Sequence, residues 1–251
     1  MLIIGHRGVP SLAPENTLGG FQKASELGVK WVELDVTLLG DATAVVIHDD
    51  TLDRCSDRQG ALRNLKYTDL LGINNAALYP EWLPEPVPLL SDVLQLLDHL
   101  DMGLNLEIKP YDIPHELLIE ILSKQIAHYF PNKEKLIVSS FDLELLNRCR
   151  SYLPEVKIGL LFDELPEDWL IIAQSLNAFS IHLDWQGMSF SQVQRIKQAG
   201  YKVYCWTLNN PSYQPFYESW GVDGIMSDWP QLFDNSDVLS VVRVRGGTEA
   251  K

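Results

Sequence analysis

The sequence has few cysteines, no long apolar run and no basic segment at its start. Its three cysteines, Cys55, Cys149 and Cys205, are odd in number and widely spaced, which excludes a disulfide framework and fits no zinc-site pattern. No apolar run reaches the roughly 18 residues that a membrane span needs. The opening Met1-Leu2-Ile3-Ile4 lacks the basic region of a signal peptide. We therefore expect a cytoplasmic protein without a membrane span.

Positive charge is also scarce. The chain has 20 lysines and arginines against 34 acidic residues, a formal net charge of −14 over 251 residues. This balance argues against a nucleic-acid partner or an anionic membrane surface, because both select basic patches. A phosphate ligand would need a local positive centre, since the overall field repels anions. The hydrophobic content of 46% is that of an ordinary globular protein, and 251 residues are enough for one large domain or two small ones.

Apolar segments alternate with amphipathic stretches along most of the chain. The predicted strands are Leu2–Gly5, Trp31–Val36, Leu104–Ile108, Lys135–Ser140, Lys157–Phe162, Ala178–Leu183, Lys202–Thr207 and Asp223–Ser227. The predicted helices are Asn16–Leu27, Ser91–His99, Pro114–Tyr129, Leu143–Tyr152, Pro166–Leu176, Ser189–Ala199 and Pro211–Trp220. This alternation is typical of an α/β protein with a (β/α)8 TIM barrel. A doubly wound open sheet is less favoured, because no glycine-rich dinucleotide loop follows the first strand.

One apolar run, Ala44–His48, interrupts the alternation. It follows Val36 after about seven residues, too few for a helical crossover to a parallel strand. We therefore interpret Trp31–Val36 and Ala44–His48 as a hairpin-like excursion, followed by an insertion over about residues 50–88 after the second strand. The insertion is rich in proline and aromatic residues near its end, which suits either a lid or a segment packed on the barrel rim. We expect one catalytic domain over residues 1–230 and a tail without pattern over 231–251.

Charged residues occur within two of the predicted strands. Strand alternation puts Glu33 and Asp35 on one face, and Glu107 and Lys109 on one face of a later strand. Barrel strands are normally apolar on both faces, and a buried ion costs several kcal/mol unless a partner offsets it. Three carboxylates without a soft ligand nearby indicate a hard cation, Mg²⁺ or Ca²⁺. The alternative is a buried ion-pair network of Glu107 with Lys109 or Arg7.

The ionisable residues fall at the C-terminal ends of the predicted strands, the face on which barrel enzymes build their sites. His6 and His48 each follow an apolar strand and adjoin an ionisable neighbour, Arg7 or Asp49. Histidine is the residue type whose ordinary pKa suits proton transfer near neutral pH. His182 also ends a strand, but nothing in the local sequence decides whether it lines the site.

Several motifs together resemble the glycerophosphodiester phosphodiesterase family, in particular its short bacterial cytosolic members. They are His6-Arg7-Gly8, Pro14-Glu15-Asn16-Thr17, Glu33-Leu34-Asp35, His48-Asp49 and Glu107-Ile108-Lys109. The match continues at Arg54, Ser139-Ser140-Phe141, Trp206-Thr207, Asp223-Gly224-Ile225 and Asp228, and spans roughly residues 2–230. The chain departs from the family pattern at Leu38-Leu39-Gly40-Asp41, where T-x-D-G is common, and at Arg54-Cys55-Ser56, where R-T-T or R-T-S is usual.

The resemblance implies metal-dependent hydrolysis of small glycerophosphodiesters to glycerol 3-phosphate and an alcohol. It implies that Glu33, Asp35 and Glu107 bind the divalent cation. It further implies substrate contacts from Arg7, Lys109, Phe141 and Trp206, and proton transfer by His6 and His48.

Our hypothesis for the reaction involves both histidines in turn. His6 removes a proton from the glycerol 2-hydroxyl as it attacks phosphorus, and His48 protonates the leaving alcohol. The roles reverse when water opens the cyclic phosphate, and the sequence leaves open an exchange of the two roles.

Two alternatives differ in substrate or in class. A lysophospholipase D of the same family would act on a lipid diester, and Tyr79, Trp82 and Leu83 are the only hint of an apolar anchor. A non-catalytic phosphate-binding barrel is the other alternative, although binding alone does not require two histidines. The headgroup alcohol, the metal used and the oligomeric state are not predicted by the sequence.

Overall fold

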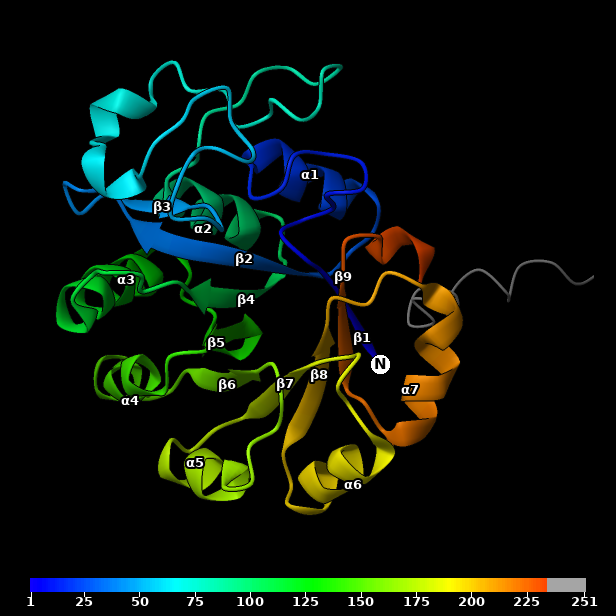
Figure 1. Ribbon diagram of the computed structural model, residues 1–251. Coiled ribbons are helices and arrows are strands. Elements are labelled where there is room, and N and C mark those ends of the chain that lie inside the picture. Colours follow the sequence, from blue (N-terminus) through cyan, green and yellow to red (C-terminus); the bar gives the residue numbers. More distant parts are fainter. Residues whose placement is uncertain (234–251) are drawn as a thin grey trace, which may run out of the picture.

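Parallel strands form a closed barrel in this computed structural model, which describes residues 1–233 (Figure 1). Within these residues a nine-stranded sheet runs in the order β1-β9-β8-β7-β6-β5-β4-β2-β3, and a further β1–β2 pairing closes the ring. The strands are β1 (Leu2–Gly5), β2 (Trp31–Leu38), β3 (Ala44–Val46), β4 (Gly103–Ile108), β5 (Leu136–Ser140), β6 (Lys157–Phe162), β7 (Ser180–Asp184), β8 (Lys202–Trp206) and β9 (Gly224–Ser227). The predicted TIM barrel is confirmed.

The helices lie around the outside of the barrel (Figure 1). They are α1 (Leu18–Glu26), α2 (Leu90–His99), α3 (His115–Tyr129), α4 (Leu143–Tyr152), α5 (Trp169–Ser175), α6 (Phe190–Gln198) and α7 (Gln214–Trp220). Their apolar faces pack on the outward-facing strand residues, for example Val32, Leu34 and Val36 of β2, which are fully buried. Burying one such side chain stabilises the fold by about 1.5–3 kcal/mol.

The predicted helix starts differ from the structure because of local capping. Helix α1 begins at Leu18 rather than Asn16, since Thr17 is its N-cap and accepts a hydrogen bond from the Gly20 amide at 3.0 Å. Helix α7 begins at Gln214 rather than Pro211, since residues 211–213 form a separate 3₁₀ turn. The tail predicted over residues 231–251 lies outside the described residues beyond residue 233.

Strand β3 accounts for the run that interrupted the alternation. It pairs antiparallel with the end of β2, with Val46 opposite Val36, so β2 belongs both to the barrel and to a hairpin. This pairing extends β2 to Leu38, two residues beyond its predicted end. The hairpin brings residue 48 back toward the C-terminal ends of the barrel strands.

The insertion that follows β3 has a small core of its own and is fastened to the barrel. Its apolar residues, among them Leu52, Leu62 and Leu70, form a cluster with the β2–β3 hairpin. The Glu85 carboxylate accepts a hydrogen bond from the Gly19 amide at the start of α1, at 2.9 Å. A Cβ on residue 19 would lie 2.1 Å from the Glu85 carboxylate, so a side chain there would displace this carboxylate. The insertion thus packs directly against the barrel rim.

Candidate active site

A cavity of about 270 Å³ opens at the C-terminal ends of the barrel strands. Charged and titratable residues from β1 to β4 line one side of it, namely His6, Arg7, Glu33, His48, Glu107 and Lys109. The later strands line the other side with Phe141, Leu161, Asp163, Trp206, Thr207 and Met226. The cavity therefore brings together all the predicted site residues except Asp35, which is 1% exposed and lies just behind the lining.

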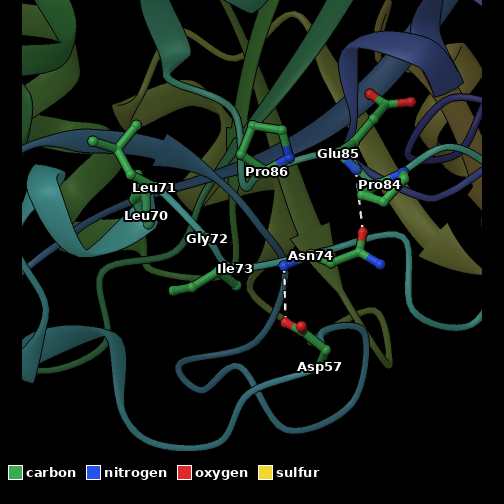
Figure 2. A pocket seen from close by; sticks show the side chains of 9 residues that line it. All are labelled: Asp57, Leu70, Leu71, Gly72, Ile73, Asn74, Pro84, Glu85 and Pro86. Carbon is green, nitrogen blue, oxygen red and sulfur yellow. Dashed lines mark hydrogen bonds between the residues drawn. The ribbon is translucent and has the colours of Figure 1, made fainter.

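A larger depression of about 550 Å³ lies within the insertion (Figure 2). Its walls are formed by Leu70 to Asn74, by Pro84 to Pro86 and by Asp57, and they contain none of the predicted site residues. Asn74 joins these walls, since its amide donates to the Asp57 carboxylate at 2.8 Å and its side-chain oxygen accepts from the Glu85 amide at 3.1 Å. This depression lies between segments of the insertion and contains no paired acid and base.

A tight turn after β1 places the first two site residues. Arg7 has φ of 52° and Gly8 has φ of +96°, so the backbone is left-handed at both positions. Such a conformation is costly for a residue with a side chain and is often found at functional sites. The turn directs the Arg7 amide to the Glu33 carboxylate at 2.9 Å, which links β1 to β2 inside the site.

Three carboxylates gather at one side of the cavity. Glu33, Asp35 and Glu107 each have an oxygen within 4.8 Å of the others, because the β2–β4 register sets Asp35 directly beside Glu107. Burial, and then the neighbouring carboxylates, raise the pKa of Glu33 well above its usual value and the pKa of Glu107 to about 7. Among the described residues, no hydrogen-bond partner reaches the buried Glu33 Oε1. This oxygen-only donor set with an unpaired oxygen suits a hard divalent cation.

Two cations stand among these carboxylates. Lys109 pairs with Glu107 and lies 3.4 Å from Asp35, and Arg7 Nε lies 3.3 Å from the other Asp35 oxygen. Although burial opposes ionisation, these cations hold the pKa of Asp35 below its usual value. The alternative ion-pair network therefore forms in part, since Glu107 pairs with Lys109, whereas Arg7 pairs with Asp35 and Glu15. It offsets only part of the negative charge, because Arg7 also bonds Glu15 at 2.9 Å and Glu33 Oε1 stays unpaired within the described part of the chain.

Each cavity histidine is held by a carboxylate at its Nδ1 atom. His6 Nδ1 lies 2.7 Å from Asp228, whose second oxygen accepts a hydrogen bond from Asn209 at 2.8 Å. His48 Nδ1 lies 2.6 Å from Asp49. A carboxylate at Nδ1 favours the tautomer that leaves Nε2 free, and it stabilises the imidazolium form. Burial lowers the pKa of His48 below its ordinary value.

The opposite wall of the cavity is aromatic. Phe141 and Trp206 meet edge to face, with ring centroids 5.6 Å apart, and Lys109 Nζ lies 5.7 Å from the Phe141 centroid. Sequence reasoning did not single out Leu161, Asp163 or Met226, which complete this wall. Leu161 and Met226 lie within the apolar strands β6 and β9, and Asp163 directly follows β6, so no motif in the local sequence marks them.

His182 does not line the cavity. It is fully buried inside the barrel, where its Nε2 lies 2.7 Å from Ser180 Oγ and its ring meets the edge of Tyr204 at 5.0 Å. Burial lowers its pKa to about 3, so the ring is neutral at ordinary pH. His182 therefore belongs to the packed interior of the barrel.

A barrel whose acid–base groups and buried carboxylates meet at the C-terminal face of the strands is an enzyme of the TIM-barrel class. The sequence model of the glycerophosphoryl diester phosphodiesterase family matches residues 6–232, and the chain belongs to this family. A glycerophosphodiester phosphodiesterase from Caldanaerobacter subterraneus subsp. tengcongensis is 33% identical over 236 residues, 93% of this chain and 96% of that protein.

Solved structures agree with this assignment. An Oleispira antarctica phosphodiesterase in complex with the product sn-glycerol-3-phosphate is 31% identical, with a TM-score of 0.87 over 97% of each chain. A glycerophosphodiester phosphodiesterase from Thermotoga maritima is 26% identical, with a TM-score of 0.75 over 98% of each chain. Separately, none of the helices within residues 1–233 combines the length and apolar character needed to cross a membrane.

Proposed function

We propose that this protein hydrolyses small glycerophosphodiesters to glycerol 3-phosphate and an alcohol, as a single catalytic unit over residues 1–230. The observation that carries the proposal is the pair of carboxylate-bound histidines facing one cavity beside Arg7 and Lys109. Two histidines can serve as base and acid on opposite sides of a phosphate, and two cations can neutralise it. The similar Oleispira antarctica structure, which contains sn-glycerol-3-phosphate, supports this choice of product.

We assign Glu33, Asp35 and Glu107 as the ligands of a divalent cation, Mg²⁺ or Ca²⁺. Their oxygens lie within 4.8 Å of one another, and the unpaired Glu33 Oε1 is a free ligand atom in the described structure. Once bound, the cation would neutralise the carboxylates and draw electron density from a phosphate oxygen.

Side chains of the protein bind the substrate and transfer the protons. Arg7 and Lys109 bind the phosphate oxygens, while Phe141 and Trp206 contact the organic part of the substrate. His6 Nε2 accepts the proton of the glycerol 2-hydroxyl as that oxygen bonds to phosphorus. The bond from phosphorus to the alcohol oxygen breaks, and His48 Nε2 supplies the proton to that oxygen. Water then opens the cyclic phosphate with the two roles reversed, and each transfer contributes about 10²–10⁴ in rate.

Release of glycerol 3-phosphate tests the proposed activity. Purified protein with Mg²⁺ or Ca²⁺ should release it from glycerophosphocholine, and the His6→Ala variant should lose at least about 10²-fold in kcat. Inactive wild-type protein across several glycerophosphodiesters and both metals would reject the activity. Full activity after chelation of divalent ions would reject the metal assignment alone.

The assignment of the two histidines has its own test. A glycerophosphodiester with a p-nitrophenol leaving group does not need its leaving oxygen protonated. This substrate should restore the rate of His48→Ala in the cyclisation step but leave His6→Ala slow. If this substrate restored the rate of His6→Ala instead, His48 would be the base and His6 the acid.

The alternatives receive less support from the described residues. Of the three residues that hinted at an apolar anchor, Tyr79 and Trp82 use their polar atoms within the fold, on Pro10 and Glu85, and only Leu83 is largely exposed, at 81%. A non-catalytic binding barrel would show tight glycerophosphodiester binding without turnover by calorimetry. The cytoplasmic location expected from the cysteine content stays a prediction.

A further inference from the structure

Arg54, in the insertion, bonds two carboxylates with its whole guanidinium group. Its Nη1 and Nη2 atoms donate to the two oxygens of Glu15 at 2.7 and 2.8 Å. Its Nε and Nη2 atoms donate to the two oxygens of Asp49 at 2.7 and 3.2 Å. Both contacts are bidentate, the geometry in which an arginine–carboxylate pair is strongest and most directional.

Each of these carboxylates also holds a residue of the cavity. Glu15 accepts a hydrogen bond from Arg7 at 2.9 Å, and Asp49 lies 2.6 Å from His48 Nδ1. A continuous chain of ion pairs therefore runs from Arg7 through Glu15, Arg54 and Asp49 to His48. Within the described structure, the three middle members do not line the cavity.

We propose that Arg54 is a positioning residue that aligns the phosphate-binding Arg7 and the proton-transfer residue His48 through Glu15 and Asp49. This inference rests on the proposed function for its effect on rate, but the chain of contacts does not depend on it. Arg54 touches no reacting atom, so it acts only through its two carboxylates.

Electrostatics explains why one cation, Arg54, can align the residues at both ends of the ion-pair chain. The Glu15 and Asp49 carboxylates bond one guanidinium, so without it two anions would face each other and move apart. Although burial opposes their ionisation, the Arg54 hydrogen bonds lower the pKa of both Glu15 and Asp49. Both carboxylates are thus held charged and fixed, and each fixes its cavity partner.

The segment that carries Arg54 is itself held in place. The Asp57 amide donates to the Asn74 carbonyl at 3.0 Å, and the Asn74 amide returns a bond to the Asp57 carboxylate (Figure 2). Asn74 in turn bonds the Glu85 amide, and Glu85 bonds Gly19 on α1. Exposed ion pairs usually contribute little, but bidentate pairs in a fixed network are the exception.

Lysine cannot replace arginine in this role. An ammonium group is a point charge without the planar fork that bonds two carboxylates at once. We therefore expect Arg54→Lys to lose most of the alignment although it keeps the charge.

The test compares Arg54→Ala and Arg54→Lys with two matched controls. Arg58→Ala removes a nearby exposed arginine of the insertion, whose Nε lies 4.0 Å from its neighbour Asp57. Asn74→Ala removes the side-chain oxygen that accepts from the Glu85 amide, but it keeps the backbone bonds between Asn74 and Asp57 and does not touch the ion-pair chain. We expect both Arg54 variants to lose about 10- to 100-fold in kcat on glycerophosphocholine and to bind inorganic phosphate more weakly. Added guanidinium ion should restore part of the kcat of Arg54→Ala and leave Arg58→Ala unchanged.

A second readout requires no turnover. In the metal-loaded wild-type protein, ¹⁵N NMR should show neutral His48 with its proton on Nδ1, and Arg54→Ala should show a mixture of tautomers. If the wild-type enzyme proves inactive, the proposed function fails while this measurement still tests Arg54. Unchanged kinetics and tautomer in Arg54→Ala would overturn the inference. The same defect in Asn74→Ala would also overturn it, since Arg54 would then only fasten the insertion.

Discussion

At the scale of single residues, the site depends on partners that are distant in sequence. Asp228 bonds His6 across 222 positions, and Asn209 bonds that Asp228 in turn. The sequence motifs predicted the histidines and carboxylates by type and by their place at strand ends. They included Asp228 but could not predict that it bonds His6, because a hydrogen bond between two loops depends on closure of the barrel.

The Asp228 carboxylate, which bonds His6, should affect the rate of the reaction and not substrate binding. We expect Asp228→Asn to lower kcat on glycerophosphocholine on the order of 10²-fold, because an amide neither favours the productive tautomer nor stabilises the imidazolium. KM should change little, since Asp228 does not line the cavity. Steady-state kinetics measures both quantities, with Asp112→Asn, an exposed aspartate of the β4–α3 loop, as the control. A variant with unchanged kcat would contradict the role of Asp228.

We expect the acidic cluster to lower the stability of the metal-free fold and to favour metal binding. Glu33 is buried, and no partner for its Oε1 lies within the described residues, so its charge destabilises the metal-free fold. We expect Glu33→Gln to raise the free energy of unfolding in a chelator by about 1–3 kcal/mol. The same change should weaken Mg²⁺ or Ca²⁺ binding at least about 10-fold. Urea unfolding and calorimetry measure the two effects, with the exposed Glu26→Gln as the control. Tighter metal binding or a less stable metal-free variant would contradict the assignment.

At the scale of elements, the pattern of apolar residues predicted the barrel because each strand and helix is defined by its own short sequence. The run Ala44–His48 was recognised as part of a hairpin from a connection too short for a crossover, and the antiparallel pairing of Ala44–Val46 bears this out. The insertion was harder to predict, because its 3₁₀ turns and single hydrogen bonds, such as Glu85 to Gly19, have no periodicity. Arg54 was noted as part of a motif, but its two partners became visible only with the insertion in place.

Strand β7 should make stability sensitive to acid. His182 has a pKa of about 3 when folded, against about 6.5 when unfolded. Between these values only the unfolded state binds the proton, so stability should fall as pH falls, by up to about 1.4 kcal/mol per pH unit. His182→Gln should remove this part of the slope in urea unfolding at pH 7, 5.5 and 4.5. The exposed His99→Gln should keep the wild-type slope, and an identical slope in all three proteins would contradict the account.

At the scale of the whole molecule, an acidic protein places two of its cations side by side in one cavity. The formal net charge is −14, yet Arg7 and Lys109 stand together at the mouth of the barrel. With the proposed divalent cation bound to the carboxylates, these two cations would complete the local positive centre that a phosphate ligand needs in a repelling field. The arrangement follows from closure, since β1 and β4 flank β2 and carry these cations to the same carboxylates.

The central claim is that this cavity hydrolyses a glycerophosphodiester through the 2-hydroxyl of its glycerol. The most direct measurement is ³¹P NMR of the wild-type protein with Mg²⁺ or Ca²⁺, given glycerophosphocholine or its analogue that lacks the 2-hydroxyl. We predict a growing signal of glycerol 3-phosphate from the first substrate and no hydrolysis of the second. Equal hydrolysis of both would contradict attack by the 2-hydroxyl, and hydrolysis of neither would contradict the proposed activity.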